Sequence, residues 1–197
     1  RFGCPGRTDL RAAAPSAAPF GIRFNPGDRT LRIRARPDLR LSEPAVAALG
    51  GTAVEAVEGF WMYRPWLLAD GCVEQPPSGQ AEGTEPNDSD AAEQSPQGPD
   101  GQRVGLAQFF TADDARTGRR DERAFETTKV LGAEEQPSPQ GYNLVLSGRL
   151  RQLPGGRVIA CRPIRSDRPP ECVVSAAFDR IKIENPVGGT VLAEWTS

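Results

Sequence analysis

The sequence predicts an all-β or β-rich protein, an antiparallel sandwich or barrel with one short helix and a long acidic insertion. Short segments alternate between apolar and polar residues, and turn residues separate them at hairpin spacing. Glycine and proline together make up 40 of the 197 residues, which favours turns and short strands over long helices. No apolar run reaches the ~18–20 residues of a membrane-spanning helix.

The first predicted element is a hairpin. Phe20, Ile22 and Phe24 alternate with small or polar residues, and the turn signal Asn25-Pro26-Gly27-Asp28 follows. The return strand alternates again, with apolar residues at 31, 33 and 35. This pattern places one face of the hairpin in a core and leaves an arginine face outside, formed by Arg23, Arg32, Arg34 and Arg36.

A short helix is predicted over residues 43–49. Ser42 is its expected N-cap, Pro44 lies in its first turn, and Gly50-Gly51 ends it. The next strand, 53–63, leads into an aromatic group formed by Phe60, Trp61, Tyr63 and Trp66. We expect these rings to pack in a core, the alternative being an exposed platform for a sugar or a protein.

Residues 74–103 differ sharply from the rest of the chain. They hold seven acidic residues, five prolines and four glycines, with no large apolar side chain between Val73 and Val104. Such a stretch buries too little surface to offset its ordering entropy. We therefore expect a flexible insertion between two strands of a single domain that spans residues 1–197.

The remaining strand signals bring the expected total to eight to ten short strands. Turn residues bound each of them, most clearly Pro154-Gly155-Gly156 and the stretch 185–189. The predicted strands are 104–110, 125–131, 142–153, 157–161, 172–177, 178–184 and 190–195.

The four cysteines have no Cys-x-x-Cys spacing, so redox and zinc-ribbon motifs are absent from the sequence. We predict a Cys161–Cys172 disulfide from the short loop between them, and Cys4–Cys72 by elimination. Four unpaired thiols in a cytosolic core are the alternative. Paired cysteines and a start at Arg1, with Met62 the only methionine, favour a periplasmic or extracellular protein, or one held at the outer membrane by an upstream lipid anchor.

The sequence contains no histidine. A Ser-His-Asp or Cys-His catalytic unit and a His-ligated metal site are therefore excluded for this chain, and we predict neither a cofactor nor a metal. A net charge of −2 gives no drive toward nucleic acid. We expect solvated surface at the acidic pairs Asp113-Asp114, Asp121-Glu122 and Glu134-Glu135, whose neighbours would point opposite ways on a strand.

Two arginine-rich sites are candidates for binding a partner protein. The loop between the predicted bridged cysteines carries Arg162, Arg165, Asp167 and Arg168, and its prolines lower the entropy cost of binding. The hairpin row presents Arg32, Arg34 and Arg36 as parallel guanidinium groups. The structural alternatives are a stabilised surface hairpin for the loop, and a solvated face paired with the chain's own acids for the row.

These observations predict a non-catalytic protein-binding domain of the bacterial cell envelope. Its most concrete form is a periplasmic inhibitor or immunity protein that blocks a toxic, secreted enzyme. One alternative is a structural or accessory subunit of an envelope assembly, with a large apolar patch. Another is a hydrolase that uses carboxylates or a cysteine thiolate.

Overall fold

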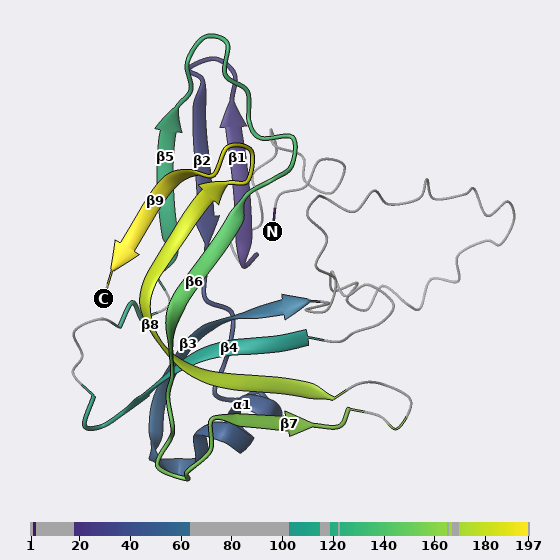
Figure 1. Cartoon of the computed structure of the whole chain (residues 1–197), viewed down its shortest axis with the longest axis vertical. Helices are drawn as coiled ribbons and strands as arrows, with labels where there is room; N and C mark the ends of the chain where they lie inside the picture. Colours follow the sequence, from purple (N-terminus) through teal and green to yellow (C-terminus); the bar gives the residue numbers. More distant parts are fainter. Residues whose placement is uncertain are drawn as a thin grey trace, which may run out of the picture.

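The computed structural model describes residues 2, 18–63, 103–114, 119–121, 123–164, 166 and 170–196. Within these residues the chain forms two β-sheets, one short α-helix and one 3₁₀ turn, η1 (Gly51–Ala53) (Figure 1). The predicted β-rich fold class is confirmed. Several sequence predictions lie outside the described residues: the insertion up to residue 102, Cys4, Cys72, Trp66, Glu122, Arg165, Asp167 and Arg168.

The smaller sheet has three antiparallel strands in the order β1-β2-β5, which are β1 (Phe20–Asn25), β2 (Thr30–Ala35) and β5 (Phe125–Val130). The predicted hairpin forms β1 and β2. Two side chains hold its turn, since Asn25 Oδ1 accepts from the Gly27 N–H and Asp28 Oδ1 accepts from the Thr30 N–H. These bonds favour the turn without help from distant strands.

The larger sheet is organised around one long strand, β8 (Glu171–Asn185). The sequence predicts two strands here, 172–177 and 178–184, whereas the structure shows one bent strand of 15 residues. Four strands pair with β8, and β3 pairs with β4. The strands are β3 (Val54–Tyr63), β4 (Arg103–Thr111), β6 (Asn143–Leu150), β7 (Ile159–Arg162) and β9 (Thr190–Thr196).

The two halves of β8 have different neighbours. Cys172 faces both Val104 of β4 and Cys161 of β7, so these two strands flank the first half on opposite edges. Strands β6 and β9 flank the second half in the same way. Among the described residues every strand pair is antiparallel except β4 with β8, which is parallel.

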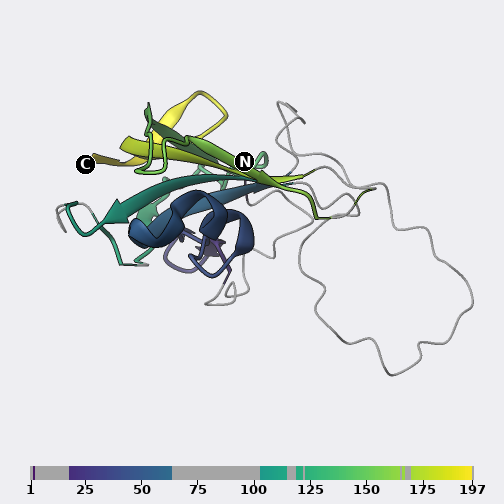
Figure 2. The same ribbon diagram turned by 90° about the horizontal axis from the view of Figure 1, so that it is seen from below.

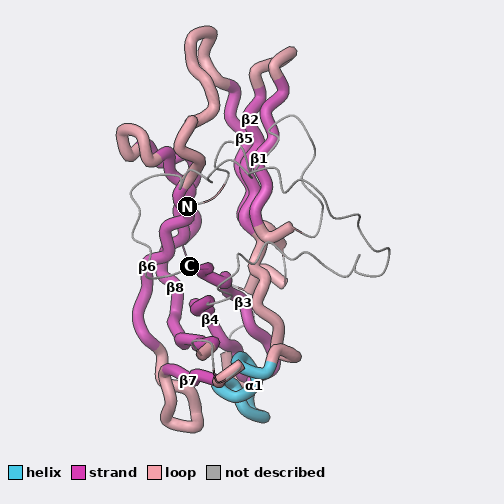
Figure 3. The backbone as a smooth tube through the Cα atoms, turned by 90° about the vertical axis from the view of Figure 1, so that its right-hand side faces the viewer, coloured by secondary structure: helices cyan, strands magenta, loops and turns pink. Residues whose placement is uncertain are grey.

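Each half of β8 belongs to a different hydrophobic core. The smaller sheet packs on the β6-β8-β9 part, as the two upright layers in Figure 3 show, and Ile33, Phe178 and Ile183 are buried between them. The helix α1 (Pro44–Gly50) covers the other core against β7 and β8 (Figure 2). Val46 and Val173 are buried there.

Strand β3 contributes to both cores through consecutive residues. Phe60 lies in the core between the sheets, and Trp61 lies in the core beneath α1. Successive side chains of a strand point to opposite faces, and here each face is covered, so both rings are at most 3% exposed. The predicted packing of the aromatic group is confirmed for these two residues.

The N-cap of α1 differs from the prediction. The cap is Glu43 and not Ser42, and no side chain caps the helix. Pro44 occupies the first helical position, where its fixed φ suits a helix start. The Glu43 carboxylate does not cap the helix; its Oε1 accepts from the Arg40 backbone N–H.

The predicted Cys161–Cys172 disulfide is present. The two cysteines lie directly opposite one another in the register of β7 and β8. A bridge that closes a loop of this size contributes about 2–3 kcal/mol in the chain-entropy description. It links β7 covalently to β8, the long strand around which the sheet is organised.

Gly148 lies where the β6-β8 register shifts between Ser147 and Gly148. A Cβ at this position would lie 2.1 Å from the carbonyl oxygen of Ala177, so the backbone would have to move. We expect Gly148→Ala to lower the free energy of unfolding by about 1–3 kcal/mol, measured by urea denaturation. Gly155→Ala is the matched control, since a Cβ there meets nothing within 4 Å; equal stability of the two variants would contradict the close approach.

Candidate functional site

The arginine row lies on the outer face of the smaller sheet. Arg32 is 61% exposed, and its Nε lies 3.3 Å from Glu126 Oε1 on β5. Arg34 faces Glu126 across the register and is half-buried. Arg36 is also half-buried, and its backbone N–H donates to the carbonyl of Pro19. The row therefore has one acidic neighbour in the strands of its own sheet, Glu126, and its role in binding stays a prediction.

The bridged end of β7 lies on the larger sheet, away from the arginine row (Figure 1). Arg162 is the last residue of β7, is exposed, and stands opposite Glu171 in the register. Ile164 follows it and is half exposed. The structure thus places Arg162 beside the disulfide, and it does not bring Arg162 and the row together on one sheet.

An apolar surface covers the side of β3, β4, β8 and β7 that faces away from α1. Trp61, Ala107 and Val173 point toward α1, so their neighbours along each strand point to the opposite side. We call this surface the apolar face; it comprises Met62, Val104, Leu106, Leu150, Ile159, Val174 and the Cys161–Cys172 disulfide.

The register aligns these residues in two rows across four strands. One row runs from Met62 through Val104 to the disulfide. The other runs from Leu106 through Val174 to Ile159. Leu150 lies beyond the second row, opposite Ala176.

Large apolar side chains in the apolar face are open to solvent. Leu150 is 70% exposed, Ile159 is 51% exposed and Met62 is 40% exposed. Single exposed apolar residues are common on soluble proteins, whereas a contiguous patch marks an interaction surface. The rows make this patch contiguous.

A network of charged residues lies on the α1 side of the same strands. Arg103 Nη2 donates to Glu43 Oε2 over 3.1 Å, and Arg103 Nε donates to Glu171. The guanidinium carbon lies 3.9 Å from the centroid of the Trp61 ring. Glu43 also accepts from Trp61 Nε1, so the network joins β3, β4, β8 and the helix start.

Asp38 lies beside this network and accepts from the Trp61 N–H over 3.0 Å. Burial of its carboxyl group raises the pKa from 3.8 to about 6, and the charge of Glu43 adds to this effect. The hydrogen bond from Trp61 and the charge of Arg103 act in the opposite direction. Asp38 therefore takes up its proton at a higher pH in the folded protein than in the unfolded chain.

Two acidic groups of the predicted pairs, Asp114 and Glu135, have structural partners. Asp114 Oδ1 lies 2.7 Å from Arg151 Nη2, and its hydrogen bonds from Thr111 lead the interactions that lower its pKa. Glu135 Oε2 accepts from the Gly132 N–H. No group of three or more His, Cys, Asp or Glu residues among those described is placed to hold a metal ion.

Comparison with protein-family models, curated proteins and solved structures finds no match to this chain. Among the described residues, no helix is both long and apolar enough to cross a membrane.

The apolar face could not be recognised from the sequence. Its members come from β3, β4, β6, β7 and β8, and in each strand they follow ordinary alternation. The one available signal is Ile159 beside Cys161, since both lie on the same side of β7. The parallel pairing of β4 with β8 brings the remaining residues alongside, and no local motif announces that pairing.

The raised pKa of Asp38 predicts a pH-dependent stability. Because the folded-state pKa lies above the unfolded value, Asp38 stabilises the fold most below about pH 4, and this contribution is lost as the pH rises to about 6. Between pH 4 and pH 7 we expect the free energy of unfolding of Asp38→Asn to rise by about 2 kcal/mol relative to that of the wild type, measured by urea denaturation. A stability difference that stays constant across this range would contradict the assignment.

Proposed function

We propose that this protein acts by binding another protein through the apolar face. The single observation that carries the proposal is the pair of apolar rows across β3, β4, β8 and β7, which stay open to solvent at Met62 and Ile159, with the exposed Leu150 of β6 beyond them. A contiguous exposed apolar patch marks an interaction surface.

Exposed arginines lie at the edge of the sheet that borders the apolar face. Between Asn143 and Ile164 the chain has four arginines and no acidic residue. Arg149, Arg157 and Arg162 are exposed along the β6-β7 edge. Arg149 and Arg162 alternate with residues of the apolar face and so point to its opposite side, and Arg157 Nη2 donates to the Ala48 carbonyl of α1. A partner that covers the apolar face and this edge presents apolar side chains flanked by carboxylates.

A second copy of this chain does not have that chemistry on the same surface. A symmetric dimer that buried the apolar face together with this edge would bring two sets of arginines together, and like charges at an interface are unfavourable. The charge distribution therefore supports a different protein as the partner over self-association.

The disulfide supports recognition by a preorganised surface. It fixes Cys161 of β7 to Cys172 of β8, with Ile159 two residues away on the same side. A surface that is already ordered loses less conformational entropy when a partner binds.

We further propose that the protein works in the bacterial cell envelope, periplasmic or extracellular, because a disulfide suits an oxidising compartment. The partner we propose is a toxic secreted enzyme, which this chain would block as an inhibitor or immunity protein. An interface whose hot spot includes Arg162 fits such an inhibitor, since arginine is enriched among interface anchors.

The test compares capture by the wild-type chain with capture by Ile159→Asp. We expect the aspartate to weaken binding of a specific partner by at least about tenfold, because it places a charge within the apolar face. Envelope and secreted fractions supply the candidates, and surface plasmon resonance with the purified candidate gives the affinity.

Val187→Asp is the matched control, because Val187 is also 51% exposed but lies in the β8-β9 turn. A protein that is lost with Ile159→Asp and with Arg162→Glu, yet retained by Val187→Asp, supports the proposal. Equal retention by all variants would refute the apolar face as the site. Concentration-dependent dimerisation that Ile159→Asp abolishes would instead favour the assembly subunit.

A further inference from the structure

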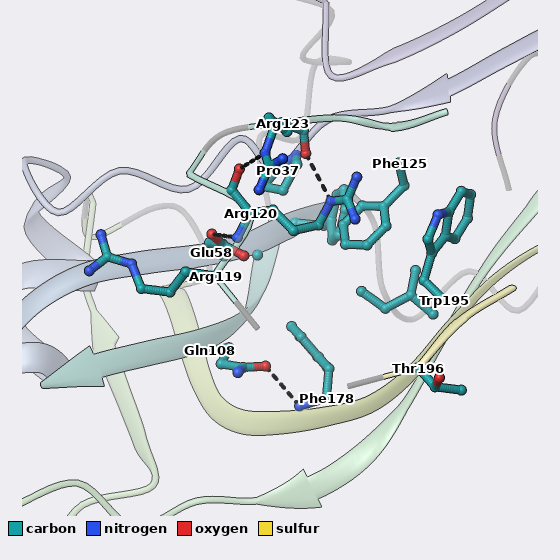
Figure 4. A pocket seen from close by; sticks show the side chains of 13 residues that line it. Pro37, Glu58, Gln108, Arg119, Arg120, Arg123, Phe125, Phe178, Trp195 and Thr196 are labelled. Atoms are coloured by element: carbon teal, nitrogen blue, oxygen red, sulfur yellow. Dashed lines mark hydrogen bonds between the residues drawn. The ribbon is translucent and has the colours of Figure 1, made fainter. Parts of the chain in front are cut away.

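A second site lies on the side of the molecule where β4 leaves β8 and β9 begins to pair with it. A cavity of about 180 Å³ opens there (Figure 4). Aromatic side chains form much of its wall, from both sheets: Phe60, Phe125, Phe178 and Trp195. Gln108 Oε1 accepts from the Phe178 backbone N–H over 3.0 Å, and both residues line the cavity.

Three arginines and one carboxylate line the same cavity. The arginines are Arg119, Arg120 and Arg123, and the carboxylate is Glu58. Glu58 Oε1 already accepts from the backbone N–H groups of Arg120 and Asp121. The described lining therefore has an excess of positive charge beside apolar rings.

Arg120 is held in place by neutral acceptors. Its Nε donates to the carbonyl of Arg123, and its Nη2 donates to the carbonyl of Ala124. The guanidinium carbon lies 4.3 Å from the Phe125 ring centroid. Burial lowers the pKa of Arg120, and the nearby charge of Arg123 adds to this effect.

Within the part of the chain that the structure describes, neither Arg120 nor Arg123 pairs with a carboxylate. Arg119 pairs with Asp121 over 3.3 Å, but its Nε is buried without a hydrogen-bond partner among the described residues. Guanidinium groups hold five N–H donors and bind carboxylates with two of them. An anion beside Arg120 would accept from the guanidinium N–H groups that the Arg123 and Ala124 carbonyls leave open.

The size of the cavity limits the ligand. A cavity of roughly 150 Å³ lined by apolar side chains holds a benzene ring, and the present one has slightly more room. A ring suits the faces of Phe125 and Trp195, which pack edge to face with centroids 5.2 Å apart. We propose that this cavity binds a small aromatic carboxylate, with the ring among the aromatic side chains and the carboxylate at Arg120.

Benzoate is the probe, and the folded wild-type chain is titrated by calorimetry and by two-dimensional NMR. We expect saturable binding that shifts the indole N–H signal of Trp195, assigned through Trp195→Phe. The Trp61 signal should stay fixed, because Trp61 lies in the other core. Benzamide should bind at least about tenfold more weakly, since it lacks the charge that Arg120 recognises.

Arg120→Met and Arg123→Met should each weaken benzoate, the first by about tenfold or more. Arg149→Met is the control, because Arg149 is 81% exposed and lies outside the cavity. Equal affinity for benzoate and benzamide, or a Trp195 signal that does not move, would overturn the proposal. This comparison needs only the wild-type chain, so the proposal stays testable even where an arginine variant fails to fold.

Discussion

Both cores depend on the unbroken backbone of β8. Val173 points into the core beneath α1, whereas Ala176 and Phe178 point into the core between the sheets. In the β6-β8 ladder Ser147 faces Arg180 and Gly148 faces Phe178, which leaves Asp179 as an extra residue. That bulge changes the parity of the strand, so Ile181 and Ile183 still face the core between the sheets. Without it, their side chains would turn to solvent.

Features that depend on near neighbours could be predicted from the sequence. The hairpin β1-β2 carries its own turn chemistry, and the Cys161–Cys172 bridge joins strands connected by a short loop. The helix position follows from Pro44 and the glycines after it, although the cap was assigned one residue early. Pro44 takes the first helical position, which makes Glu43 the cap, and the Glu43 carboxylate binds Trp61 and Arg103 without capping the helix.

Features that depend on distant pairing could not be predicted. Asp179 and Arg180 resemble a break in the hydrophobic pattern, yet the strand continues through them because its edges remain paired on β6 and β9. The parallel pairing of β4 with β8 joins segments far apart in the chain. The β4-β8 pairing creates the apolar face. The arginine-lined cavity opens where this pairing ends. Of the residues predicted to bind a partner, Arg162 alone lies beside the apolar face within the described residues, next to the predicted disulfide that forms part of it.

Strand β3 locks the alignment of the molecule through its two consecutive rings. Phe60 and Trp61 fill different cores, so a slip of β3 by one residue would exchange them. The indole would then enter a stack built from phenyl rings, where Phe60 now lies 6.0 Å from Phe20 and 6.2 Å from Phe125. The phenyl ring, with no N–H donor, would replace the indole beside the Glu43 carboxylate. A one-residue shift of β3 would therefore destabilise the packing of both hydrophobic cores at once. This penalty selects a single native register for the sheet.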